Sequence, residues 1–133
     1  MLRNRDDIER FLERRVSKFS ALDDATFLVT LAPQQPSAIV RVQPPVVLVQ
    51  VDVGEAAFQN QEQECAFYRK LLELNSTDLL HASYGLNGSR VQLSAALELD
   101  NLDENELEAT LSDVTLALAN QVPVLRQMVT AKA

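Results

Sequence analysis

The stretch 82-ASYGLNGSRVQLSAALEL-99 indicates the fold, because it places a tight turn between two extended segments. Asn87-Gly88 is the strongest short hairpin signal, since a type I′ turn requires positive φ at both central residues. Across such a turn we expect Leu86 to lie opposite Ser89. After the turn, apolar and polar residues alternate, which predicts a strand with one buried face. Its apolar face carries Val91, Leu93, Ala95, Leu97 and Leu99.

The two glycines of this stretch could instead form a loop that cradles a ligand. Gly85-Leu86-Asn87-Gly88 lacks the lysine and the Ser/Thr of a P-loop, and it falls short of the G-x-G-x-x-G pattern. Both phosphate-binding folds need a helix after the glycines, whereas a strand pattern follows here. We therefore predict a turn and no phosphate-binding site.

Three further strands are predicted upstream, where residues 26–53 are rich in β-branched side chains. The expected strands cover 26–31, 38–42 and 46–53, and prolines punctuate the gaps between them. Short gaps imply an antiparallel meander. In the third strand valines alternate with more polar residues, so we expect a sheet that is covered on one side only. Gly54 is expected to end that strand.

Three helices complete the pattern. In residues 5–19, apolar side chains recur at helical spacing, namely Ile8, Phe11, Leu12, Val16 and Phe19. A second helix is predicted over 62–75, and a third starts after Asp103, a candidate N-cap, and stops or kinks around 120–122. The predicted fold class is α+β, an antiparallel β-sheet with helices in the order α-β-β-β-α-β-β-α, in one domain over residues 1–133.

The helix over 62–75 has an unusually wide apolar face. One row is Phe67, Leu71 and Leu74, and the neighbouring row is Cys65, Tyr68 and Leu72. Because one row suffices for a helix that lies on a single sheet, the second row indicates either a contact with another subunit or a helix sunk deeply into its own core. Cys65 itself is expected to pack in the core as a small apolar side chain.

Composition excludes several classes of function. The net charge is −7 at pH 7, so the chain as a whole repels phosphate backbones and anionic membranes, and we expect no nucleic-acid binding. No apolar run is long enough for a signal peptide or a membrane span, which predicts a cytoplasmic protein. One histidine and one cysteine cannot assemble a His/Cys zinc site.

Catalytic or metal chemistry has little support in the sequence. His81 lies near Asp78, Ser76 and Ser83, so a Ser-His-acid arrangement can be drawn, but no G-x-S-x-G motif supports a nucleophilic serine. Acidic residues cluster over 98–113, where their spacing lacks the EF-hand pattern and its central glycine. We therefore predict no enzymatic activity, no catalytic residue, no cofactor and no metal.

One extended motif runs through the second half of the chain. It comprises Leu71-Leu72-Glu73-Leu74-Asn75, Tyr84-Gly85-Leu86 with Asn87-Gly88, Val91-Gln92-Leu93-Ser94-Ala95-Ala96-Leu97 and Leu102-Asp103-Glu104-Asn105-Glu106-Leu107. Together with the order of elements, it resembles the type III secretion chaperone superfamily, including CesT-type chaperones and YbjN-like proteins. Ser83-Tyr84-Gly85-Leu86, Ala95-Ala96-Leu97 and Leu118-Ala119-Asn120 are also similar to the YjfI-like family. These are mostly turn and core residues, so they report fold more specifically than function.

The resemblance implies a small acidic homodimer without enzymatic activity, which binds an extended segment of a client or regulatory protein. To the dimer surface we assign Phe67, Tyr68, Leu71 and Leu72. To the client groove we assign Ile8, Phe11, Leu12 and Val29. The alternative is a regulatory protein of the YjfI or YbjN kind that acts in a stress or envelope pathway.

Overall fold

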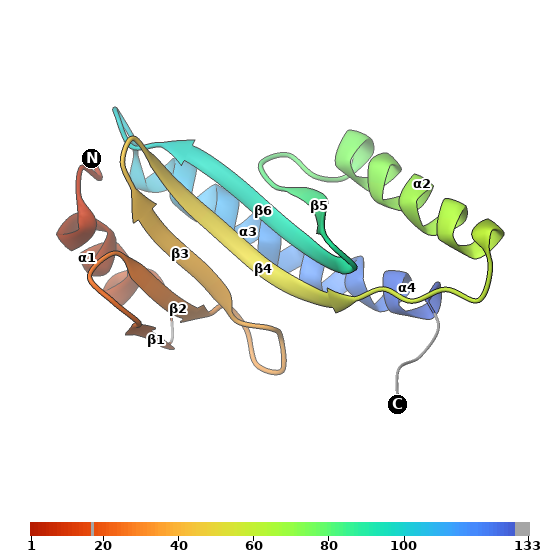
Figure 1. The fold of residues 1–133 in the computed structure, drawn as a ribbon. Helices are drawn as coiled ribbons and strands as arrows, with labels where there is room; N and C mark the ends of the chain where they lie inside the picture. The colour runs from red at the N-terminus through yellow and green to blue at the C-terminus, as the bar shows by residue number, and fades with distance from the viewer. Residues whose placement is uncertain (17, 130–133) are drawn as a thin grey trace.

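The computed structural model describes residues 1–16 and 18–129, which form one antiparallel sheet and a layer of helices (Figure 1). Its six strands follow the order β1-β2-β3-β4-β6-β5 across the sheet. The strands are β1 (Lys18–Ala21), β2 (Thr26–Thr30), β3 (Ala38–Gln43), β4 (Val46–Glu55), β5 (Ser83–Asn87) and β6 (Arg90–Glu98). The helices are α1 (Arg5–Arg15), α2 (Gln61–Thr77), α3 (Glu104–Asn120) and α4 (Val122–Gln127). The predicted α+β class and antiparallel sheet are confirmed.

Alternation along the strands separates the two faces of the sheet. Phe27, Val40, Val49 and Ala95 lie in one row across β2, β3, β4 and β6, and all four are buried. Arg41, the next residue along β3, is exposed on the opposite face. The helices bury their apolar residues against the first face, with α3 behind the centre of the sheet, α1 near β1 and α2 near β5 (Figure 1). The predicted one-sided cover of the sheet is therefore confirmed.

The first helix is shorter than predicted, because the chain becomes extended after Arg15. Val16 already has φ −117° and ψ 150°. Phe19 belongs to β1, and its ring packs edge-on against Phe27 with the ring centroids 5.9 Å apart. A spacing of three between apolar residues fits a helix locally, but pairing with β2 satisfies the backbone groups of Lys18 and Ser20 and overrides that pattern. The sheet thus has one more strand at this edge than the sequence predicted.

The hairpin between β5 and β6 is present, but its loop lies one residue later than predicted. Leu86 pairs with Val91 instead of Ser89, so the central residues of the turn are Gly88 and Ser89. Only Gly88 has positive φ, at 62°, which fits a type II′ turn rather than a type I′ turn. The partner of Leu86 differs by two positions between the predicted and the observed register, so both registers keep the same residues on the buried face. The hydrophobic pattern could not distinguish them for that reason.

Strand β4 does not end at Gly54, so that prediction was wrong. The strand continues to Glu55, and its pairing with β6 is irregular between Asp52 and Gly54. Gly54 adopts φ +134° at this point, a conformation that side chains larger than hydrogen disfavour. The glycine therefore marks a β-bulge within the strand.

The third helix begins and ends close to the predicted places. Asp103 occupies the N-cap position, although its side chain makes no capping hydrogen bond. The break at Gln121 separates α3 from α4 and lies within the predicted interval. Pro123 falls in the first turn of α4, where a missing N–H removes no helical hydrogen bond. In the described part of the chain, no helix is long and apolar enough to cross a membrane.

Candidate protein-binding surfaces

The β1 edge of the sheet has backbone groups that can pair with another strand. The Leu22 N–H donates to the Thr26 carbonyl oxygen at 2.8 Å, which makes these two residues a hydrogen-bonded pair of the hairpin. Bonded and non-bonded pairs alternate in antiparallel strands, so the N–H and C=O groups of Phe19 and Ala21 point away from β2. Within residues 1–16 and 18–129, no hydrogen bond reaches these outward groups. This edge is open to strand addition.

The β5 edge, on the other side of the sheet, is occupied at Tyr84 by a side chain. Asn75 Oδ1 accepts a hydrogen bond from the Tyr84 N–H at 2.7 Å, and Asn75 Nδ2 donates to the Tyr84 carbonyl oxygen at 3.2 Å. The amide thereby makes the two bonds that a neighbouring strand would make at this residue. By the same alternation Leu86 is the next residue of β5 whose backbone points outward. The two edges of the sheet are therefore not equivalent.

The four residues assigned to the client groove lie inside the protein. Ile8, Phe11 and Leu12 of α1 and Val29 of β2 have no exposed surface. These side chains are not accessible in this structure, because they form the core between α1 and the sheet. The exposed leucines of the same region are Leu22, directly after β1, and Leu28, on the open face of β2.

Two of the four residues assigned to the dimer surface are accessible. Phe67 and Leu71 are buried, Tyr68 is half-buried and Leu72 is 68% exposed. The ring of Phe58 packs against this face, with centroid distances of 5.4 Å to Phe67 and 5.7 Å to Tyr68. The wide apolar face of α2 therefore contacts its own chain for the most part. A dimer surface on α2 stays a prediction for Tyr68 and Leu72.

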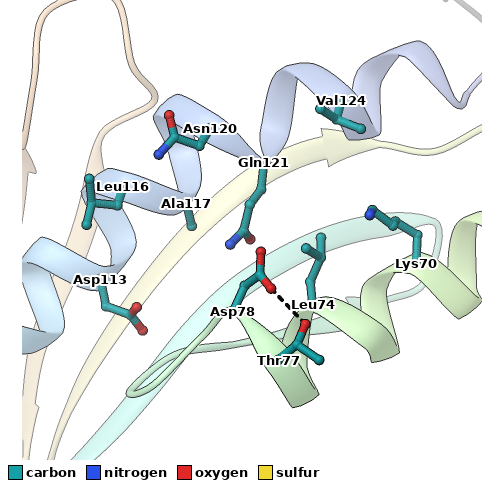
Figure 2. Close-up of a pocket in the computed structure, with 10 residues that line it drawn as sticks. All are labelled: Lys70, Leu74, Thr77, Asp78, Asp113, Leu116, Ala117, Asn120, Gln121 and Val124. Atoms are coloured by element: carbon teal, nitrogen blue, oxygen red, sulfur yellow. Dashed lines mark hydrogen bonds between the residues drawn. The ribbon is translucent and has the colours of Figure 1, made fainter.

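A groove of about 520 Å³ lies between α2 on one side and α3 with α4 on the other (Figure 2). Its apolar lining includes the buried residues Leu74 of α2 and Ala117 of α3. On the α3 and α4 side, Leu116 is 60% exposed and Val124 is 45% exposed. Apolar side chains gathered on a surface in this way are a feature of protein interaction sites.

Asp113 of α3 lines the same groove and holds the connection between α2 and β5. Its Oδ2 atom accepts hydrogen bonds of 3.2, 2.8 and 3.0 Å from the backbone N–H groups of Leu80, His81 and Ala82. The hydroxyl of Tyr84 donates to Gln121 Oε1 at 2.8 Å. Burial, with the nearby charge of Asp113 as a lesser cause, raises the pKa of Tyr84 well above its usual range. These contacts attach the start of β5 to the helix layer.

Among the described residues, no hydrogen bond links the side chain of His81 to Ser76, Asp78 or Ser83. His81 is exposed, and its backbone N–H contacts Asp113. The Asp78 carboxylate accepts a hydrogen bond from the Thr77 hydroxyl at 2.7 Å. Among the described residues, no group of three or more His, Cys, Asp or Glu side chains could hold a metal ion.

Cys65 is exposed, so its predicted place in the core was wrong. It lies two residues before the buried Phe67, about 200° away around the helix. The second apolar row of α2 therefore turns away from the sheet at this position.

A family model decides what kind of protein this fold represents. The CesT_Tir_1 model matches residues 1–131. The chain belongs to the CesT_Tir_1 family. A comparison with curated protein sequences gives no significant match.

Solved structures share the fold of this CesT_Tir_1 member at low sequence identity. A chain of the ExoU–SpcU complex from the type III secretion system of Pseudomonas aeruginosa has a TM-score of 0.70 and 18% identity, covering 90% of this chain and 98% of that chain. A chain of the Yersinia pestis SycH–YscM2 complex has a TM-score of 0.58 and 14% identity, covering 84% and 92%. YbjN from E. coli has a TM-score of 0.64 and 8% identity, covering 96% and 95%. The resemblance to type III secretion chaperones and YbjN-like proteins is confirmed, and the YjfI-like branch stays a prediction.

Proposed function

We propose that this chain is a non-enzymatic protein-binding module of the secretion-chaperone kind. It acts in the cytoplasm as a homodimer and binds an extended segment of a partner protein. The observation that carries this proposal is the difference between the two sheet edges. Phe19 and Ala21 direct free backbone groups outward from β1, whereas Asn75 occupies the corresponding groups of Tyr84 on β5. In strand addition, main-chain hydrogen bonds supply affinity and pockets for alternate side chains supply specificity.

The surroundings of β1 favour a partner segment with alternating apolar residues. Phe19 pairs with the buried Val29 and so lies on the helix side of the sheet, while Ser20 pairs with Leu28 on the open side. Successive side chains of an added strand would point alternately to these two sides. SycH, whose complex has a similar fold, is a type III secretion chaperone bound to a fragment of YscM2, which supports a role of this kind.

A proline substitution at the open edge tests the proposal. Ala21→Pro removes an outward N–H, and proline is tolerated in edge strands whose N–H faces solvent, so we expect the fold to persist. Proteins encoded beside the gene would be co-expressed with the chain one at a time, and hydrogen exchange would locate any bound segment. We expect the bound segment to protect the backbone amides of residues 18–22 of the parent chain from hydrogen exchange. We expect Ala21→Pro to lower the affinity for the partner by roughly tenfold or more, because the proline removes a ladder hydrogen bond and adds a steric obstacle.

Leu86→Pro is the matched control, because Leu86 is an outward-facing residue of the opposite edge strand. We expect this variant to bind the partner as tightly as the parent chain does. Equal affinity of Ala21→Pro and the parent chain for a partner that binds the parent would contradict the assignment of the β1 edge.

A further inference from the structure

The turn between β5 and β6 leaves the side chain of Asn87 accessible at the tip of the hairpin. Asn87 is the last residue of β5, is exposed and pairs with Arg90 of β6. Within residues 1–16 and 18–129, no hydrogen bond engages its side-chain amide. The amide carbon of Asn87 is therefore open to attack by a neighbouring nucleophile.

Gly88 supplies that nucleophile, because its backbone N–H lies outside the hydrogen bonds of the hairpin. Since the backbone groups of Tyr84 and Leu86 point outward, Asn87 and Arg90 form the hydrogen-bonded pair that closes the ladder before the turn. In the described part of the chain, no backbone hydrogen bond engages the Gly88 N–H. Gly88 has φ 62°, and a Cβ atom at this position would meet nothing within 4 Å, so no side chain shields the nitrogen.

We propose that Asn87-Gly88 is a self-modification site, at which the chain deamidates Asn87 without an enzyme or a cofactor. The Gly88 nitrogen gives its proton to water or hydroxide and bonds to Cγ of Asn87. The bond between Cγ and Nδ2 then breaks, Nδ2 takes up a proton, and ammonia leaves behind a cyclic succinimide. Water opens this ring at either carbonyl carbon and yields aspartate or isoaspartate at position 87. The net reaction consumes water and releases ammonia, with no change of oxidation state.

The structure disfavours this reaction at the other asparagines. Asn75 also precedes a small residue, Ser76, but its amide makes hydrogen bonds of 2.7 and 3.2 Å with the Tyr84 backbone. Asn101 precedes the buried Leu102, whose N–H donates to a carbonyl oxygen. The remaining asparagines cap helices or lie within them, namely Asn4, Asn60, Asn105 and Asn120. Among the described residues, Asn87 alone combines an amide free of hydrogen bonds with an unshielded neighbouring nitrogen.

The two products differ in their effect on the hairpin. Aspartate keeps the backbone unchanged and places a carboxylate opposite Arg90, whose Nε already donates to Asp52 Oδ2 at 2.7 Å. Isoaspartate routes the main chain through Cβ and so adds a backbone atom before Gly88. The carbonyl oxygen of the next residue, Ser89, accepts a hydrogen bond from the Ala56 N–H at 2.9 Å. The longer backbone of isoaspartate therefore displaces the turn that holds Ala56.

Incubation of the purified full chain at mildly alkaline pH tests the site. Peptide mapping by mass spectrometry would follow each asparagine, and an isoaspartate-specific methyltransferase would detect the rearranged product. We expect Asn87 to deamidate at least about tenfold faster than Asn75, because Asn75 must first break its two hydrogen bonds. The rate at Asn87 should rise with pH, because the Gly88 nitrogen must lose its proton. An intact Asn87 in a chain that has deamidated elsewhere would overturn the proposal.

Three variants separate this mechanism from simple hydrolysis of an exposed amide. Gly88→Ala places a methyl group beside the attacking nitrogen and should slow the loss of ammonia at position 87 by about tenfold. Gly85→Ala is the matched control, since Gly85 lies in the same strand, has open space for a Cβ atom and does not follow an asparagine. This control should react as fast as the parent chain.

Asn87→Gln keeps the turn glycine and an exposed amide, but its longer side chain would have to form a larger ring. We expect no measurable loss of ammonia at position 87 in this variant. If either Gly88→Ala or Asn87→Gln reacts as fast as the parent chain, the backbone nitrogen is not the nucleophile and the proposal fails.

Hydrogen exchange of the separated products tests the effect on the turn. Ion exchange would separate them from the parent chain, because each product carries an additional negative charge. We expect faster exchange at Ala56 in the isoaspartate fraction and unchanged exchange in Asn87→Asp, which has the ordinary backbone. Equal exchange in the isoaspartate fraction and the parent chain would contradict the displacement of the turn. These measurements involve no partner, so they are independent of strand addition at β1.

Discussion

Asp113 gives a direct test of how the helix layer holds β5. Replacing it with alanine removes the single oxygen that accepts the N–H groups of Leu80, His81 and Ala82. Hydrogen bonds to a charged group contribute about 1.5–3 kcal/mol each. Leu80 and His81 are exposed, so water can replace the carboxylate at their amides, whereas the buried Ala82 loses its partner outright.

We therefore expect Asp113→Ala to lower the free energy of unfolding by about 2–3 kcal/mol. Asp113→Asn should lower the free energy of unfolding by about half as much, because its amide oxygen keeps one uncharged acceptor in place. Urea unfolding would measure both variants, and hydrogen exchange should show faster exchange at residues 80–82.

Ser112→Ala is the control for the Asp113 variants, since Ser112 is exposed on the neighbouring position of α3. We expect it to change the free energy of unfolding by less than about 0.5 kcal/mol. If Asp113→Ala also changes the free energy of unfolding by less than about 0.5 kcal/mol, or if hydrogen exchange at residues 80–82 is unchanged, the carboxylate does not hold the connection between α2 and β5 and the reasoning fails.

Two further substitutions test the contacts around β5. Asn75→Ala should lower the free energy of unfolding by about 1–2 kcal/mol and expose a second sheet edge, so light scattering should show increased self-association. Ser76→Ala is the control, because Ser76 is the exposed neighbour of Asn75. Equal stability and equal self-association of the two variants would argue against the role of Asn75 at the sheet edge. Tyr84→Phe should cost about 1 kcal/mol near neutral pH through loss of the bond to Gln121. Because burial raises the pKa of Tyr84 in the folded chain, the neutral phenol contributes stability that is complete below about pH 10 and is lost as the pH rises toward the folded pKa. Urea unfolding at pH 8 and above pH 10 should thus show a smaller alkaline loss in Tyr84→Phe than in the parent chain, and equal losses would contradict this assignment.

The sequence predicted the elements whose signal is local. Alternation in 46–53 and 91–97 identified the buried face of β4 and β6, because side chains of a strand repeat every two residues. Asn87-Gly88 located the hairpin, and Pro123 located the break between α3 and α4. The family motif added the fold class, since its turn and core residues depend on that fold.

The sequence did not predict the contacts that distinguish the surfaces. Apolar residues of α1 and α2 were assigned to binding surfaces, yet Ile8, Phe11 and Phe67 pack inside the chain. A periodic apolar face is the same signal whether the contact is the protein's own core or another molecule. In this structure the sheet and the ring of Phe58 cover Phe67, while a dimer surface at Tyr68 and Leu72 stays a prediction.

What the sequence determined by itself is the α+β class, the faces of the main strands and the positions of most chain reversals. The tertiary structure alone decided that 18–21 form a strand, that Asn75 occupies the β5 edge at Tyr84 and that a groove separates α2 from α3. Asn75 reaches Tyr84 from nine residues away, and Asp113 reaches Ala82 from 31 residues away. No local pattern encodes such contacts, because a side chain hydrogen-bonds whichever backbone group the complete fold brings within about 3 Å of it.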